Sequence, residues 1–429
     1  MPFVGRLWSA AMFGGSDRER DLAALVVPRA GRVERTGSPW EPFRLVDRDG
    51  GVVGAAGEYL RDLQAAGRGE ATQRSYAHDL LRWFRFLWAV RVPWDQATRA
   101  EARDFCRWVQ IAAKPAVTHW RHAGGELAPA ASPAAVASVP NPVTGKAAPG
   151  PCYAPATAAH AESVLRGFYE FHLDAGTGPM VNPFPLARGR AGAHRNPMEP
   201  ARDIRAGRYR PRLVQRSPRC IADDKFNEIF AGLGSHRDRA LVAFWVSAGA
   251  RASELLGARA GDVDAGQQLI TVIRKGTRAL QQLPASPDAF VWLRLYQAQM
   301  HGLVPAGRDD PLWWTLRKPF RQLTYHAAYR MFTRVNATLE TNWGIHDLRH
   351  TAAYRMARDP GVPLTDVQWI LGHARLATTQ LYVSAPADEA IASILAYYSR
   401  RAEEPDSPAA QAPGYRAESL DVLFGQALR

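Results

Sequence analysis

Residues 346–382 read HDLRHTAAYRMARDPGVPLTDVQWILGHARLATTQLY. His346 and Arg349 are three residues apart, so on a helix they lie on the same face. His373 follows a Leu-Gly pair, where a helix that ends at glycine would place it at the C-terminus. Tyr382 follows in an apolar segment. Taken singly, these residues have ordinary explanations, because a helix dipole favours a C-terminal histidine and an apolar face favours a buried tyrosine.

Further upstream, residues 249–256 read GARASELL, which puts Arg251 between one helix that ends at a glycine and another that begins near Glu254. Residues 269–274 (LITVIR) are rich in β-branched side chains and predict a strand. Gly276 marks a turn, and a second strand through Leu283 would close a hairpin with Lys275 at its tip. Helices are predicted from Asp223 or Asp224 to Leu233 and over the apolar segment 238–247.

The ordered set Arg251, Lys275, His346-x-x-Arg349, Leu-Gly-His373 and Tyr382 resembles the catalytic signature of the tyrosine recombinase (phage integrase) family. The phrases GARASELL, HDLRHT and LGHARLATTQLY match the family around these residues, and the likeness covers about residues 221–400. It extends more weakly to ATQRSYAHDLLRWFRFL and TAAHAESVLRGFYEFH, which look like the family's helical core-binding domain. Six matching groups in order form a far more specific signal than any one of them.

The resemblance implies roles that suit these residue types. Arg251 and Arg349 would bind the phosphate oxygens, because a guanidinium group binds phosphate in bidentate fashion and stays protonated. His373 would donate a third hydrogen bond to the same oxygens. Tyr382 would attack phosphorus and form a covalent phosphotyrosine. No cofactor, metal ion or ATP is implied, and no glycine-rich phosphate loop with Lys-Ser/Thr occurs in the sequence.

Proton transfer would fall to Lys275 and His346. The resemblance makes Lys275 the general acid on a mobile hairpin and lets His346 help to deprotonate the tyrosine. The segment after Lys275, KGTRALQQLP, is one residue longer to its proline than the family phrase. Glu254 is expected to cap or brace Arg251, whereas the sequence leaves the role of His350 open.

The predicted fold is mainly α with a small β-sheet. The resemblance implies that it is arranged as a helical core-binding domain and a mixed α+β catalytic domain. Thr72 is placed at the N-cap of a helix within the first of these. The predicted boundaries are an N-terminal extension of unassigned function at 1–52, a helical DNA-binding domain at 53–187 with a Pro/Ala-rich insertion at 112–155, a basic linker at 188–219, the catalytic domain at 220–400 and a tail at 401–429.

The formal net charge of +13 favours a polyanionic partner. The linker is rich in arginine, and we predict that it lies along DNA phosphates, since each cation near the backbone displaces condensed counterions. The alternative is a solvated tether. The candidate nucleic-acid-binding residues are Arg190, Arg205, Arg208, Arg210 and Arg212.

Cys106, Cys152 and Cys220 are far apart and odd in number, which argues against disulfides and a zinc site and favours a reducing compartment. No signal peptide and no apolar run of membrane-spanning length is recognisable. The sequence therefore predicts a cytoplasmic protein, and its Ala, Arg, Gly and Pro bias suggests a bacterial or phage origin.

The resemblance implies site-specific recombination of double-stranded DNA: integration, excision or transposition of a mobile element by a homo-tetramer on synapsed DNA. The amphipathic segment ADEAIASILAYYSRR would then dock on a neighbouring protomer. A type IB topoisomerase and a catalytically silent DNA-binding regulator are the alternatives. The Leu-Gly-His phrase and the helical N-terminal domain favour a recombinase, and the presence of every expected group argues against the regulator. The DNA target and the choice between integrase, transposase and resolvase stay open.

Overall fold

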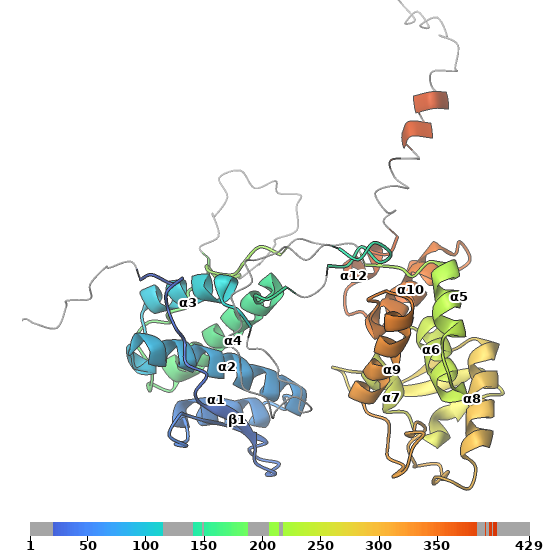
Figure 1. Ribbon diagram of the computed structural model, residues 1–429, viewed down its shortest axis with the longest axis horizontal. Helices are drawn as coiled ribbons and strands as arrows, with labels where there is room; N and C mark the ends of the chain where they lie inside the picture. The colour runs from blue at the N-terminus through green and yellow to red at the C-terminus, as the bar shows by residue number, and fades with distance from the viewer. Residues whose placement is uncertain are drawn as a thin grey trace, which may run out of the picture. The chain divides into compact units, whose positions relative to one another are not determined.

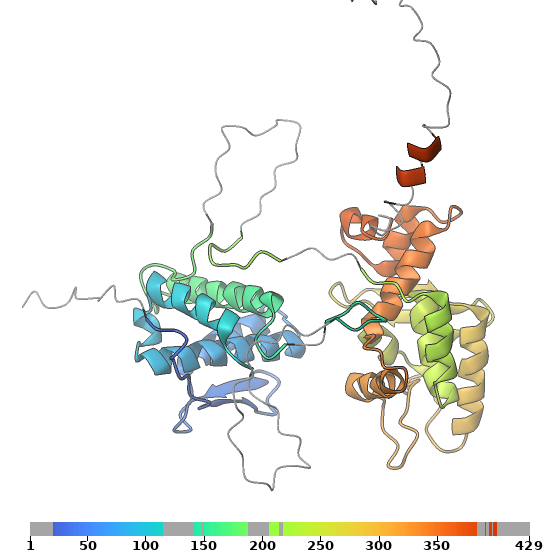
Figure 2. The same ribbon diagram turned by 45° about the horizontal axis from the view of Figure 1, so that its top comes forward.

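A computed structural model of the chain describes residues 20–114, 140–147, 150–187, 206–213 and 218–383, together with 391, 394–396 and 398–400 (Figures 1 and 2). The chain divides into two compact units, residues 1–215 and 216–429. Each unit has its own hydrophobic core, so each is described by itself. The fold is mainly α with small antiparallel sheets, as predicted.

The first unit is a helical bundle with a hairpin at its N-terminal end. Its elements are β1 (Arg32–Arg35), β2 (Phe43–Val46), α1 (Gly54–Ala65), α2 (Glu70–Val90), the 3-10 turn η1 (Trp94–Gln96), α3 (Arg99–Ile111) and α4 (Pro155–Asp174). Helix α2 buries a continuous face that includes Leu80, Trp83 and Leu87. The indole of Trp83 donates to the Tyr169 hydroxyl of α4 at 3.0 Å, which joins the two long helices through the core.

The hairpin β1–β2 was not predicted, because the sequence of residues 1–52 shows no clear alternation. Leu45 and Val46 are buried, and Arg85 of α2 donates to the carbonyls of Ala30 and Gly31 at 2.6 and 2.8 Å. The prediction that Thr72 caps a helix is wrong. Helix α2 begins at Glu70 after Gly69, and the Thr72 N–H already donates to the Gly69 carbonyl.

Part of the predicted linker is folded onto the first unit. Within residues 206–213, the Arg208 N–H donates to the Pro185 carbonyl at 2.8 Å, and the Arg210 guanidinium donates to the Ser163 hydroxyl of α4 at 2.6 Å. Gly207 lies directly against the buried carboxylate of Glu162. Arg208 and Arg212 are exposed. Arg190 and Arg205 lie outside the described residues.

The second unit places helices around a three-stranded antiparallel sheet with the strand order β3-β4-β5. The sheet strands are β3 (Val263–Asp264), β4 (Leu269–Ile273) and β5 (Leu280–Pro284), so the predicted hairpin is confirmed and β3 adds a third strand. The helices are α5 (Asp223–Ala231), α6 (His236–Ala248), α7 (Ala252–Leu256), the 3-10 turn η3 (Ala260–Asp262), α8 (Pro287–Met300), α9 (Tyr325–Thr338), α10 (Ile345–Arg358), α11 (Leu364–Leu371) and α12 (Leu376–Gln380).

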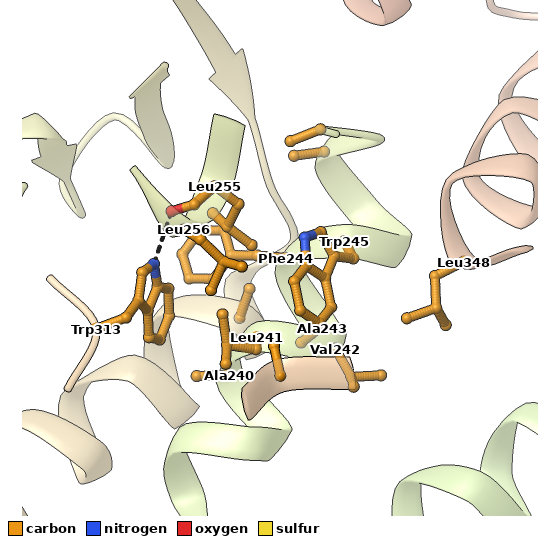
Figure 3. Close-up of a cluster of buried hydrophobic side chains, with 14 of the residues drawn as sticks. Ala240, Leu241, Val242, Ala243, Phe244, Trp245, Leu255, Leu256, Trp313 and Leu348 are labelled. Carbon is orange, nitrogen blue, oxygen red and sulfur yellow. Dashed lines mark hydrogen bonds between the residues drawn. The ribbon is translucent and has the colours of Figure 1, made fainter. Parts of the chain in front are cut away.

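Helix α6 is the centre of the second core, and Figure 3 shows its apolar side chains surrounded by other buried groups. The side chains from Ala240 to Trp245 are buried on every face of the helix, which is typical of a central helix. The Trp313 indole donates to the Leu255 carbonyl at 2.9 Å. This bond anchors the short helix α7, which directly follows Arg251, to the core.

In the part of the chain that the structure describes, no helix is long and apolar enough to cross a membrane. The three cysteines are free thiols, and Cys106 is buried in the first core.

Candidate active site

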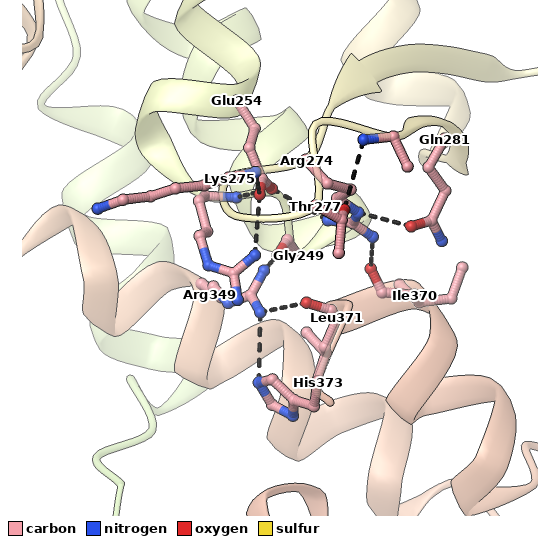
Figure 4. A network of polar contacts seen from close by, with 12 residues as sticks. Gly249, Glu254, Arg274, Lys275, Thr277, Gln281, Arg349, Ile370, Leu371 and His373 are labelled. Carbon is pink, nitrogen blue, oxygen red and sulfur yellow. Dashed lines mark hydrogen bonds and ion pairs between the residues drawn. The ribbon is translucent and has the colours of Figure 1, made fainter. Parts of the chain in front are cut away.

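Glu254 is the centre of a polar network at the start of α7 (Figure 4). Helix α6 ends at Gly249 (φ 60°), and Arg251 then occupies the N-cap of α7. Glu254 accepts from the Arg251 backbone N–H at 3.0 Å and from the Arg251 guanidinium at 2.8 Å. It also accepts from the Arg274 guanidinium at 3.0 Å and from the Lys275 backbone N–H at 2.9 Å. The prediction that Glu254 caps or braces Arg251 is confirmed, and Glu254 does both.

The electrostatics of Glu254 follow from these donors. Burial by itself would raise the pKa of the carboxyl group, but the backbone N–H groups of Lys275 and Arg251 and the Arg251 guanidinium outweigh burial and lower the pKa to about 2. Glu254 is therefore a carboxylate at neutral pH. It holds two guanidinium groups and the base of the β4–β5 hairpin at one point.

Arg349 projects from α10 into the same region and is 3% exposed. Its guanidinium donates to the Gly249 carbonyl at 2.6 Å and to the Leu371 carbonyl, so it joins the C-terminal ends of α6 and α11. Burial, together with the charge of Arg251, lowers the pKa of Arg349 to about 10. The group remains a cation at neutral pH. A third contact joins it to His373 at 3.3 Å (Figure 4).

His373 lies in the turn after α11, which ends at Gly372 (φ 60°) as the sequence predicts. Its Nε2 faces the Arg349 guanidinium, and its Nδ1 lies 3.0 Å from the Thr379 hydroxyl. Burial and the charges of Arg349 and Arg251 lower the pKa of His373 to about 4. Since guanidinium only donates, a neutral ring with its proton on Nδ1 satisfies both contacts.

Tyr382 follows α12 and is 5% exposed. Its ring lies nearly parallel to that of His373, with an interplanar angle of 9° and a centroid distance of 6.2 Å. Its hydroxyl lies 2.8 Å from Nδ1 of His350. Burial raises the pKa of Tyr382, while the charge of Arg349 opposes the rise. The tyrosine is therefore neutral and held next to both histidines.

His350, whose role the sequence left open, is the histidine that contacts the tyrosine hydroxyl. Burial, His346 and Arg349 lower the pKa of His350 to about 4 in spite of Asp347. His346 packs edge-on against the His350 ring, with 4.4 Å between centroids. His346 is exposed, and partial desolvation and the charge of Arg349 lower its pKa. The spacing of four residues on one helix face could have signalled that His350 shares this surface.

The structure thus brings Arg251, Arg349, His373 and Tyr382 into one connected cluster. Lys275 joins it through its backbone only, because Figure 4 shows its side chain extended away from the Arg349–His373 pair. An open cavity of about 780 Å³ lies beside the cluster, between the β4–β5 hairpin and α11. Its lining includes Arg251, Lys275, Gln368, Trp369 and His373. Among the described residues, no group of three or more His, Cys, Asp or Glu side chains could hold a metal ion.

A sequence profile of the phage integrase family matches residues 221–389, which contain this whole cluster. Residues 221–389 form a domain of the phage integrase, or tyrosine recombinase, family. The recombinase domain resembles tyrosine recombinase XerD of Neisseria meningitidis serogroup B, with 28% identity over 180 residues, 40% of this chain and 60% of the relative. Tyrosine recombinase XerC of Serratia marcescens is 31% identical over 192 residues, 44% of this chain and 60% of the relative. The chain therefore spans about 60% of the length of these curated relatives.

Solved structures extend the likeness beyond the recombinase domain. The Tn1549 transposon integrase in complex with circular intermediate DNA matches with a TM-score of 0.51 and 14% identity, covering 79% of this chain and 98% of that one. A lambda integrase dimer bound to a COC′ core site matches with a TM-score of 0.50 and 15% identity, covering 76% of this chain and 96% of that one. At these identities the likeness establishes the fold.

Proposed function

We propose that this protein is a site-specific DNA recombinase that cleaves and rejoins strands through a covalent 3′-phosphotyrosine at Tyr382. One observation carries the proposal: the hydroxyl of the buried Tyr382 lies within hydrogen-bond distance of the neutral His350, beside the Arg349–His373 pair. The relatives of the domain are named tyrosine recombinases, which supports the same reaction.

Arg251 and Arg349 are suited to hold the scissile phosphate. Both are cations whose positions are set by protein contacts, so little reorganisation is needed when the phosphate enters. Nε2 of His373 faces the Arg349 guanidinium. A bound phosphate oxygen would accept from the Arg349 N–H in place of His373. Its negative charge would also offset the positive charges of the arginines that lower the pKa of His373. His373 would then carry a proton on Nε2 and donate it to the phosphate oxygen.

In the cleavage step, the Tyr382 oxygen forms a bond to phosphorus while the bond from phosphorus to the 5′ oxygen breaks. The tyrosine proton passes to Nδ1 of His350, and the Lys275 ammonium group protonates the leaving 5′ oxygen. His346, packed on His350, is the second histidine of this proton path. Rejoining reverses each transfer: a 5′ hydroxyl attacks phosphorus, Tyr382 leaves, and both protons return. One phosphoester replaces another, so no external energy source is needed.

We further propose a specific site on double-stranded DNA as the substrate, recombination of a mobile element as the role, and a homo-tetramer on synapsed DNA as the active assembly. The exposed Arg208 and Arg212, with Arg210 and the predicted Arg190 and Arg205, would follow the phosphates. Exposed apolar side chains after the nucleophile, Ile391, Ile394, Leu395 and Tyr398, suit docking on a neighbouring protomer. The proposed setting is the cytoplasm of a bacterium, with a bacterial or phage-encoded gene.

Covalent trapping tests the proposal. The full chain is mixed with duplexes from the flanks of its own gene, quenched in SDS and compared with Tyr382→Phe. We expect an adduct with the wild type and none with the variant, which lacks the attacking oxygen. Binding without an adduct would reject the recombinase in favour of the regulator. Relaxation of an unrelated supercoiled plasmid without site preference would favour the topoisomerase.

A further inference from the structure

Arg274, which precedes Lys275, is the buried cation of the site that the proposed mechanism does not use. It is 4% exposed and directly follows strand β4. Its backbone closes the hairpin, because its N–H donates to the Ala279 carbonyl at 2.9 Å and its carbonyl accepts from the Arg278 N–H at 3.0 Å. Arg274 therefore stands at the base of the turn that carries Lys275.

The guanidinium of Arg274 uses all three of its nitrogens in contacts within the protein (Figure 4). Nη1 donates to Glu254 at 3.0 Å, and Nε donates to Gln281 of β5 at 2.6 Å. Nη2 donates to the Ile370 carbonyl in the last turn of α11. Each of the three nitrogens of Arg274 therefore already has an acceptor within the protein, and the proposed mechanism gives this guanidinium no phosphate contact.

These contacts join the hairpin to the helix that precedes His373. The last carbonyls of a helix lack partners within the helix and attract cations. Gln281 reinforces the link by donating to the Trp369 carbonyl at 2.9 Å. Gly372 permits the close approach, because a Cβ at this position would lie 3.3 Å from the Arg274 guanidinium. A lysine would supply a point charge instead of a planar fork and could not replace three divergent contacts.

We propose that Arg274 is a positioning residue for Lys275. It joins the base of the hairpin to Glu254 and to the end of α11. This fixed base sets the point from which the Lys275 side chain reaches the leaving 5′ oxygen. The inference rests on the proposed function, in which Lys275 is the general acid. The base of the hairpin is held because the Arg274 guanidinium and the Lys275 N–H both donate to Glu254. The tip, residues 275–280, is exposed. The tip can therefore move while its base stays in place.

A change of leaving group tests this role. The cleavage position is first mapped with wild-type protein on a duplex selected by binding from a randomised pool. Sulfur then replaces the bridging 5′ oxygen at that position. A thiolate leaves without a proton because thiols are far more acidic than sugar hydroxyls, so the modified duplex does not need the general acid. The full-length variants are Arg274→Lys, Lys275→Ala and the matched control Arg278→Lys, a conservative change at an exposed arginine of the same hairpin.

We expect Arg274→Lys to form the adduct with ordinary DNA about 10²-fold more slowly than wild type, as a misplaced catalytic group would. On the sulfur-containing duplex, Arg274→Lys should form the adduct within about tenfold of the wild-type rate, and so should Lys275→Ala. Arg278→Lys should match the wild-type rate on both duplexes. An equal deficit of Arg274→Lys on both duplexes, or no deficit at all, would overturn the inference. Failure of the wild type to form an adduct with either duplex would instead reject the proposed function and the inference with it.

Discussion

The Tyr382 hydroxyl and Nδ1 of His350 lie within hydrogen-bond distance of each other, at 2.8 Å. Burial raises the pKa of the tyrosine, and desolvation lowers the pKa of His350 to about 4. Both groups are neutral at pH 7, and when the His350 ring carries its proton on Nε2, the hydroxyl is the donor and Nδ1 is the acceptor. In that tautomer the nucleophile of the proposed reaction is already hydrogen-bonded to a group that can take its proton.

This contact predicts that His350 contributes more than His346, the other histidine on this face of α10, to the rate of adduct formation. We predict that His350→Phe, which keeps a ring but removes the acceptor, slows formation of the covalent adduct by about 10²-fold, the usual size of a general-base contribution. His346→Phe should slow it by less than about tenfold, because His346 contacts the His350 ring and not the hydroxyl. Single-turnover adduct formation measures both rates. A larger loss in His346→Phe than in His350→Phe would contradict the ranking.

The same histidines predict a pH dependence of stability without DNA. The pKa values of His350 and His373 are lowered from 6.5 to about 4 by burial and neighbouring positive groups. Between these values the unfolded chain takes up protons that the folded protein does not. The free energy of unfolding should therefore fall as pH falls from 6.5 to 4, by on the order of 1–2 kcal/mol per histidine after allowance for partial exposure.

Urea denaturation of the full chain at a series of pH values measures this dependence. The comparison with His350→Asn isolates one contribution, because other titrating groups are common to both proteins. We expect the variant to lose less stability than the wild type between pH 6.5 and 4. Parallel curves for the two proteins would show that His350 does not contribute.

Glu254→Gln should destabilise the protein by roughly 3 kcal/mol, because it leaves the buried Arg274 guanidinium without its carboxylate partner. In the folded protein the pKa of Glu254 is lowered from 4.5 to about 2. The contribution of the Glu254 carboxylate to the free energy of unfolding is therefore present above pH 4.5 and is lost as pH falls toward 2. Urea denaturation at pH 7 measures the effect. Glu228→Gln is the control, since its ion pair with Lys225 is exposed and should contribute less than about 1 kcal/mol. Similar losses in the two variants would contradict the central position of Glu254.

Gly207→Ala tests the docking of residues 206–213 on α4. An added Cβ would lie 1.6 Å from a buried carboxylate oxygen of Glu162, so the segment or the glutamate must move. We expect a destabilisation of about 2 kcal/mol, typical of an overpacked site, together with faster cleavage of this segment by trypsin. Gly54→Ala is the control, because nothing lies within 4 Å of its added Cβ. If both variants were equally stable, Gly207 would not be required for docking.

Features that depend on short stretches of sequence were predictable. Gly249 and Gly372 both end helices with positive φ, as the Ala-Gly and Leu-Gly-His phrases indicate. The β-branched run 269–274 is largely strand β4, and its partner follows after a turn at Gly276. The hairpin β1–β2 was missed because its stability comes from packing on α2 and from the Arg85 contacts, which its own sequence does not encode locally.

Some features of the candidate site likewise follow from short stretches of sequence, and others follow from the fold. The types and order of the site residues follow from the sequence alone, and helical spacing puts His346 and Arg349 on one face of α10. The contacts of Tyr382 with His350, 32 residues away, and of Arg274 with Ile370, 96 residues away, come from the folded arrangement of the helices. Local periodicity acts over a few residues. Contacts between distant side chains depend on where the cores place whole helices, and burial then sets their pKa values.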